Sequence, residues 1–157
     1  MLTIERLRGL LSYDPETGIF RWRISRGGNA PAGRVAGTIR KKCGHRQIRV
    51  DDRTYFAHRL AWFYMTGVWP KEQIDHHNVN PDDNRWSNLR EANGSQNSGN
   101  TKVKRAGLKG VVFHKHNKKY QAQICSKYLG LFDTEQEAHE AYLRAASKRY
   151  GEFARAA

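Results

Sequence analysis

The chain has 157 residues, enough for one domain or two small ones, and its 28 Lys and Arg against 15 Asp and Glu give a net charge of +13. The basic excess is spread along the chain, because residues 1–100 carry 16 basic against 10 acidic side chains (+6) and residues 101–157 carry 12 against 5 (+7). Both parts are therefore expected to attract a polyanion in a salt-dependent way. No apolar run approaches the roughly 20 residues that a membrane-spanning helix requires, so no membrane partner is expected.

The start of the chain and its two thiols carry further expectations about the class of protein. Residues 1–6 lack the long apolar segment that follows a basic start in a signal peptide. Cys43 and Cys125 stand far apart without a Cys-x-x-Cys pair, so neither a zinc ribbon nor a disulfide scaffold is expected. A cytoplasmic location is the resulting expectation.

Residues 2–56 predict a short helix followed by a small antiparallel sheet. The apolar spacing over residues 2–11 favours an amphipathic helix, with Thr3 as its N-cap. The Asp-Pro-Glu-Thr-Gly run at residues 14–18 is typical of a tight turn. Alternating patterns predict a sheet within residues 12–56 whose solvent face carries arginines. Its strands are expected at residues 19–23, 35–39, 46–50 and 54–56, with a hairpin turn at Asp51 and Asp52.

The rest of the chain completes an α+β fold with two domains. Residues 57–65 predict a helix that stops at Gly67. Residues 101–108 are basic and poor in apolar side chains, which is typical of a linker. Strands are then expected at residues 109–115, 119–126 and 127–132, followed by a helix with a capping box at Thr134 and Glu137. The expected architecture is a domain over residues 1–100 and a three-stranded sheet packed on one helix over residues 109–157.

Asp75, His76 and Asn97 supply the groups that single-metal hydrolysis of a phosphodiester needs. Imidazole titrates near neutrality, so His76 can take a proton from water. A carboxylate from Asp75 and an amide oxygen from Asn97, together with phosphate oxygens and waters, suit Mg²⁺, with Mn²⁺ as the alternative. Neighbouring strand residues point in opposite directions, so Asp75 and His76 should lie where a strand bends. His77 is the alternative base.

The order of motifs around these residues resembles the HNH homing endonucleases of phages, whose core is a strand–loop–strand–helix around one metal ion. The motifs are Ile-Asp-His, Asp-Asn-Arg, Ser-Asn-Leu-Arg and Gln-Asn within residues 74–97. The resemblance implies an HNH nuclease domain over residues 1–100 with a ββα-metal core at about 72–100. It implies that Asp75 and Asn97 bind the metal and that His76 is the general base. It also implies that Asn88 braces the loop and orients the histidine, with Asn84 as the alternative.

Three further side chains near this core carry weaker expectations. His58, at the start of a predicted helix, is expected to be structural or to contact phosphate rather than to bind metal. Arg85 and Arg90 are expected either to grip DNA phosphates or to be solvated.

About residues 107–153 resemble the Apetala-type DNA-binding domain, which is expected over residues 109–157, in the motifs Lys-Gly-Val, Lys-Tyr-x-Ala-x-Ile, Tyr-Leu-Gly-x-Phe-Asp-Thr and Glu-Ala-x-x-Ala-Tyr. The resemblance implies that the three-stranded sheet lies in the DNA major groove. Strand alternation places one set of side chains under the helix, namely Val111, Phe113, Tyr120, Ala122, Ile124 and Leu129. The residues expected to contact DNA are Lys109, His114, Lys119, Gln121, Gln123 and Tyr128.

These observations predict a metal-dependent DNA endonuclease of homing or nicking type, with double-stranded DNA as its partner, in the cytoplasm of a phage-infected or prophage-carrying bacterium. One alternative is an Apetala-type regulator that binds DNA without cleaving it. The other is a structure-specific nuclease with little sequence preference. No heptad or apolar stripe predicts a dimer, so a monomer is expected.

Overall fold

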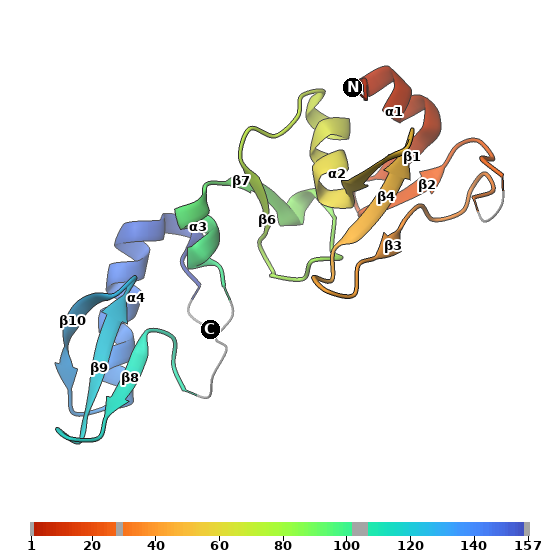
Figure 1. Ribbon diagram of the computed structural model, residues 1–157. Helices are drawn as coiled ribbons and strands as arrows, with labels where there is room; N and C mark the ends of the chain where they lie inside the picture. Colours follow the sequence, from red (N-terminus) through yellow and green to blue (C-terminus); the bar gives the residue numbers. More distant parts are fainter. Residues whose placement is uncertain (1, 28–29, 102–106, 156–157) are drawn as a thin grey trace. The chain divides into compact units, whose positions relative to one another are not determined.

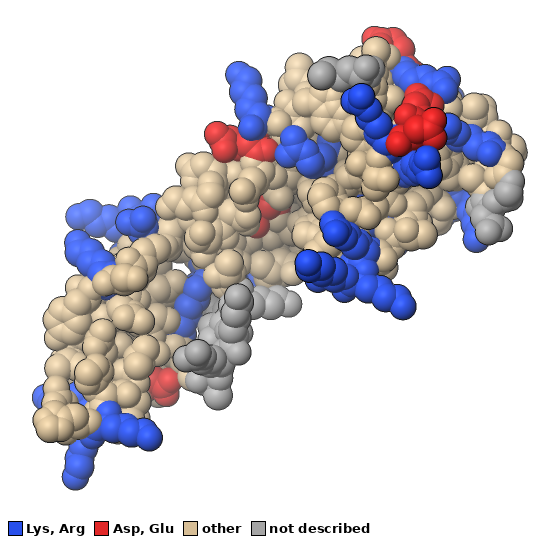
Figure 2. All heavy atoms as spheres, viewed as in Figure 1, with Lys and Arg blue, Asp and Glu red and all other residues tan. Residues whose placement is uncertain are grey.

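The computed structural model describes residues 2–27, 30–101 and 107–155, and the chain divides into two compact units, residues 1–92 and 93–157 (Figure 1). Both units combine helices with antiparallel sheets, which confirms the α+β class. Lys and Arg side chains project from both units on the face shown in Figure 2. The predicted linker falls mainly on residues 102–106, outside the described residues. No helix of the described segments is long and apolar enough to cross a membrane.

The first unit begins with a capped helix that leads directly into a hairpin. Helix α1 (Ile4–Leu10) starts at Thr3, whose hydroxyl accepts a hydrogen bond from the Arg6 N–H at 3.2 Å. Strand β1 (Leu11–Asp14) pairs antiparallel with β2 (Ile19–Trp22) across the predicted turn. The helix, its cap and the turn are therefore confirmed.

A three-stranded sheet follows, in the order β3 (Thr38–Ile39), β4 (Arg46–Val50) and β5 (Arg53–Phe56). Asp51 and Asp52 have positive φ angles of 45° and 62°, the conformation that a two-residue hairpin turn requires. The strand predicted at residues 35–39 is shorter than expected. Gly37 interrupts it at a φ of 84°, where a Cβ would lie 2.3 Å from the Gln47 carbonyl oxygen. Only an isolated bridge from Val35 to Arg21 precedes the break.

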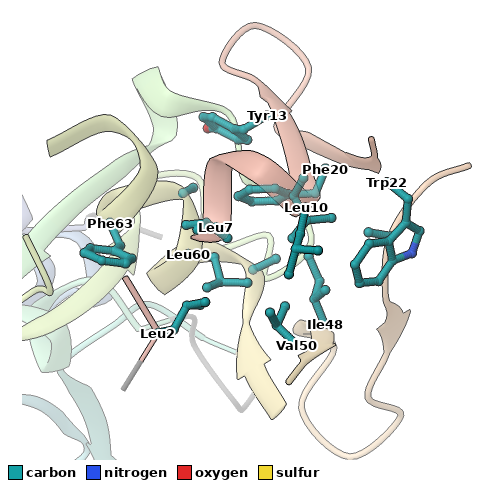
Figure 3. Packing of buried hydrophobic residues seen from close by; sticks show 14 of the residues in the cluster. Leu2, Leu7, Leu10, Tyr13, Phe20, Trp22, Ile48, Val50, Leu60 and Phe63 are labelled. Carbon is teal, nitrogen blue, oxygen red and sulfur yellow. The ribbon is translucent and has the colours of Figure 1, made fainter. Parts of the chain in front are cut away.

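Helix α2 (Ala57–Thr66) covers this sheet and closes the core of the first unit. The side chains of Leu7, Phe20, Ile48 and Leu60 are fully buried, and Figure 3 shows them meeting between α1, the strands and α2. Gly67 ends the helix in the left-handed conformation, as predicted. The core thus fixes the first turn of α2.

The hairpin that carries the predicted site comes last in this unit. Strand β6 (Gln73–His76) pairs antiparallel with β7 (Leu89–Ala92), and the 3₁₀ turn η1 (Trp86–Asn88) leads into β7. Asp75 stands opposite Arg90, and His76 stands opposite Leu89. Residues 77–88 therefore form a twelve-residue loop between the strands.

The second unit starts with the short helix α3 (Gly94–Gly99), which packs on α4 (Glu135–Tyr150) and on the 3₁₀ turn η2 (Gly151–Phe153). The contact is close, since a Cβ at Gly99 would lie 2.7 Å from Cγ of Tyr150. The boundary between the compact units consequently precedes α3, whereas the expected domain boundary at residue 100 follows it.

The C-terminal sheet is formed by β8 (Val111–His114), β9 (Lys119–Ile124) and β10 (Lys127–Phe132), with β9 in the centre. Helix α4 begins with the predicted capping box of Thr134 and Glu137. Ala122 and Ile124 are buried as expected, but the burial predicted for Phe113 is wrong. Its side chain is 50% exposed, because β8 is an edge strand and α4 lies mainly against β9 and β10. Its ring instead leans on Tyr120, with 5.0 Å between centroids.

Candidate functional site

His76 is the last residue of β6, and the chain turns directly after it. The Val79 N–H donates to the His76 carbonyl at 2.8 Å, and the His77 N–H donates to the Asn88 carbonyl at 2.9 Å. Val79 has a φ of 54°, a conformation that costs a β-branched residue on the order of 1–3 kcal/mol. Strained backbone of this kind persists where the surrounding structure enforces it. The turn thus fixes where the strand ends and where His76 sits.

Asp75 is buried in a cross-strand ion pair. Its Oδ2 lies 3.0 Å from Nε and from Nη2 of Arg90, and the carboxylate side chain is 5% exposed. Arg90 was expected to grip DNA phosphate or to be solvated, and the structure places it on Asp75. A buried carboxylate requires such a partner, because leaving water is unfavourable for an isolated charge. Arg90 therefore compensates the negative charge at the predicted metal ligand.

The His76 ring is also buried, at 5% exposure, and lies against polar neighbours. Its Nε2 is 3.5 Å from Oδ1 of Asn84, a long contact. Burial lowers the pKa of His76 below its ordinary value of 6.5, the Asn84 contact opposes this shift, and His45 adds to it. The imidazole is accordingly neutral at pH 7, which is the form that can accept a proton.

Asn84 is held from a distant part of the chain. Its backbone oxygen accepts a hydrogen bond from the buried Tyr13 hydroxyl at 2.7 Å, and its side-chain amide donates to the Asp82 carbonyl at 3.0 Å. The β1–β2 turn packs closely against the backbone of Asn84, since a Cβ at Gly18 would lie 2.3 Å from the Asn84 carbonyl carbon. The N-terminal hairpin therefore positions the residue that contacts His76.

Asn88 closes the base of the loop. Its Oδ1 accepts from the Asn78 N–H at 3.0 Å, and its Nδ2 donates to the Asp83 carbonyl at 2.7 Å. The sequence predicted both roles chiefly for Asn88. In the structure Asn88 links the two ends of the loop, and Asn84 contacts the ring of His76. His77, the alternative base, is exposed.

Asn97 lies on α3, in the second unit. A capping box of Asn93 and Gln96 begins this six-residue helix. At its other end, Nζ of Lys109 donates to the carbonyls of Gly99 at 2.7 Å and Thr101 at 2.8 Å. Lys109, expected to contact DNA, thus caps α3. Shared binding of one ion by Asp75 and Asn97 stays a prediction.

The other residues predicted to contact DNA differ in their exposure and in whether they form ion pairs within the protein. Arg85 is half exposed and pairs with Asp83 at 2.6 Å. Lys119 pairs with Asp133 at 3.0 Å. Tyr128 is 57% exposed. His114 is also exposed, whereas Gln121 and Gln123 are half-buried neighbours on β9.

Sequence reasoning missed a cluster of three imidazoles around His76. The ring of His45 lies 4.9 Å from that of His58 and 5.5 Å from that of His76, and the rings of His58 and His76 are 5.1 Å apart. His58 was expected to be structural or to contact phosphate, and no role was predicted for His45. Nothing in the spacing of these residues could have revealed the cluster, because three separate elements bring them together.

Residues 55–98 match the family model for the HNH endonuclease, a segment that runs from β5 through β7 into α3 and includes Asp75, His76 and Asn97. Searches of curated proteins and of solved structures gave no significant match. The family match supports a nuclease that hydrolyses DNA, a class of enzyme that generally uses a divalent metal ion.

Proposed function

We propose that the protein is a metal-dependent DNA endonuclease of homing or nicking type in which His76 is the general base. One observation carries the proposal: within the segment that matches the HNH endonuclease, a neutral histidine at a strand end adjoins a buried carboxylate. Phosphodiester hydrolysis needs an activated water and compensation of charge on the phosphoryl oxygens. His76 and Asp75 are suited to these two tasks.

The contact with Asn84 supports the role of His76. An amide oxygen beside Nε2 favours the tautomer with the proton on Nε2, since that N–H can then donate to Oδ1. The lone pair then resides on Nδ1, which can take a proton from water. Asn84 is a positioning residue in this scheme, and Asn88 acts one step further away by closing the loop.

The metal ligands of the proposal are Asp75 and Asn97. A carboxylate and an amide oxygen form an all-oxygen donor set, which fits Mg²⁺ or Mn²⁺ better than a thiolate- or imidazole-binding ion. When bound, the ion would stabilise negative charge on the phosphoryl group. Arg90 keeps the carboxylate of Asp75 in place within the hairpin.

The C-terminal sheet is proposed to dock in the major groove of double-stranded DNA. Val112 and Tyr128 are exposed on this sheet, and the second unit carries a net charge of +7. A structure-specific nuclease with little sequence preference is the second candidate. It is favoured because two side chains that were expected to contact DNA have partners within the protein: Lys109 is hydrogen-bonded to α3, and Lys119 pairs with Asp133. A monomer would cut one strand, because one site addresses one phosphate.

The test is incubation of supercoiled plasmid with the protein in Mg²⁺, in Mn²⁺ and in EDTA. We expect nicked circles with either ion and intact plasmid in EDTA. A His76→Ala protein purified in the same way controls for contaminating nucleases. Intact plasmid under every metal condition, with DNA binding retained, would leave the non-cleaving regulator as the better reading. Cutting of unrelated plasmids at equal rates would favour the structure-specific nuclease.

A further inference from the structure

We propose that His45, His58 and His76 form a binding site for a borderline transition-metal ion such as Zn²⁺, and that an ion bound there inhibits the nuclease by occupying His76. The first part stands on the geometry of the cluster alone, whereas the inhibition rests on the function proposed above. This site is made of nitrogen donors and is distinct in its chemistry from the oxygen donors Asp75 and Asn97.

Three different elements supply the imidazoles, all within the first unit. His45 immediately precedes β4, His58 lies in the first turn of α2, and His76 ends β6. One ring nitrogen from each lies within 4.8 Å of the other two. A zinc ion held at its usual distance to nitrogen brings such atoms to roughly 3.3 Å from one another, so the ring nitrogens must close by at most about 1.5 Å. His45 is half-buried at the end of a turn, where a change of side-chain rotamer can supply this movement.

A buried nitrogen of His58 points independently to a ligand. The His58 side chain is almost fully buried, and its Nδ1 has no hydrogen-bond partner among the described residues. Buried polar atoms are rarely left without a partner, and such an atom calls for an ion, a water or a functional role. A metal ion at the centre of the cluster would satisfy the lone pair of this imidazole.

The donor set and its surroundings favour a transition-metal ion as the occupant. Burial lowers the pKa of His45 and of His58, which leaves these two imidazoles in the neutral form that binds metals. Phe56 stacks on His58 with 5.4 Å between ring centroids, so one wall of the cluster is apolar. Neutral imidazoles select Zn²⁺, Co²⁺ or Ni²⁺ over Mg²⁺. Three protein ligands also leave a fourth position for water or another small ligand.

The inhibition follows because the ring of His76 would be both a ligand of this ion and the general base. A nitrogen lone pair that binds a metal ion cannot accept a proton from water, so the ion and the catalytic proton compete for His76. Zn²⁺ at the imidazole cluster would therefore slow cleavage that Mg²⁺ supports. The nuclease would be active only where free Zn²⁺ stays below the dissociation constant of the cluster.

The binding test is a spectroscopic titration of the full-length protein with Co²⁺ after removal of metals by a chelator. We expect visible absorption bands of a nitrogen-coordinated ion that saturate at one equivalent, with affinity about 100-fold weaker in His45→Gln and in His58→Gln. Asp75→Asn should retain the bands, which separates this site from the oxygen site. His77→Gln is the matched control, because it removes an exposed neighbouring imidazole.

Circular dichroism of each variant shows whether it folds, and His45→Gln keeps the test decisive should His58→Gln unfold. Absent bands in the native protein, or unchanged bands in folded His45→Gln, would overturn the proposed site.

The inhibition test adds Zn²⁺ to plasmid cleavage supported by Mg²⁺. We expect the native protein to slow, and His45→Gln to require about 100 times more Zn²⁺ for half-inhibition, with each protein measured against its own rate without Zn²⁺. Cleavage that Zn²⁺ supports or leaves unchanged would overturn the inhibitory role. Cobalt bands without any nuclease activity would refute the proposed function and leave the imidazole site standing, so the two failures are distinguishable.

Discussion

In the first unit His76 is positioned by hydrogen bonds from distant elements, whereas in the second unit Asn97 lies on a short helix held by close packing. The loop after His76 is tied to Tyr13, and Arg46 pairs with Asp82 of the same loop at 2.9 Å. Helix α3 depends instead on contact between Gly99 and Tyr150. In both cases part of the support comes from outside the segment that matches the HNH endonuclease, namely from Tyr13, Arg46, Gly99 and Tyr150. The segment supplies the chemical groups and some of the contacts that hold them, and the remainder of each unit supplies the others.

The largest expected effect comes from removing the proposed base. We expect His76→Ala to lower the rate of plasmid cleavage by about 10³-fold, the range of general base catalysis, while DNA binding persists. His77→Ala is the matched control and should stay within a few-fold of the native rate, since its side chain is exposed. The opposite pattern, with His77→Ala inactive and His76→Ala active, would transfer the role to the neighbour.

Gly99→Ala tests the packing that holds Asn97. An added Cβ would meet Cγ of Tyr150 at 2.7 Å, so we expect α3 to shift and the free energy of unfolding of the second unit to fall by about 1–3 kcal/mol. Cleavage should fall with it. Gly94→Ala is the control on the same helix, because nothing lies within 4 Å of its Cβ position. Equal stability and activity of the two variants in urea unfolding and plasmid assays would show that the contact does not position α3.

Acidification tests the burial of the imidazole cluster. Burial lowers the pKa of His58 from 6.5 to about 3, so between these values the unfolded chain binds a proton that the folded chain does not. The contribution of neutral His58 to the free energy of unfolding is fully present above pH 6.5 and declines as the pH falls. From pH 7 to pH 5 the contribution of His58 to the free energy of unfolding should drop by about 2 kcal/mol. Urea unfolding in EDTA at the two pH values measures the total change, which should be about 2 kcal/mol smaller in a folded His58→Gln variant.

Tyr13→Phe probes the hydrogen bonds of the first unit and should have the smallest effect. Loss of the hydroxyl leaves the buried Asn84 carbonyl without this donor, which costs about 1 kcal/mol of stability. The ring resonances of His76 should shift in NMR spectra, because Asn84 lies against that ring. Tyr128→Phe, on the exposed sheet face, serves as the control. An unchanged His76 spectrum in Tyr13→Phe would show that the N-terminal hairpin does not position the site.

Elements with local signals could be predicted from the sequence. The Thr3 cap, the Gly67 stop and the capping box at Thr134 each depend on residues within one turn, and all three are confirmed. The hairpin turn at Asp51 and Asp52 is local as well. Such features need no knowledge of the tertiary structure.

Features that depend on tertiary contacts could not be predicted in this way. The bond from Tyr13 to Asn84 spans 71 residues, and no pattern in the sequence marks it. The exposure of Phe113 depends on where α4 crosses the sheet, although strand alternation alone predicts an inward side chain. His45 and His76 lie close together only because the tertiary fold joins three separate segments of the chain.

The close fit of α3 against α4 also bears on protein engineering. A designer who exchanged the C-terminal sheet for another by joining chains near residue 100 would separate a six-residue helix from the surface that supports it. A junction between residues 92 and 93 would transfer helix and support together. Chimeras made at the two junctions should therefore differ in solubility and yield before any activity is measured.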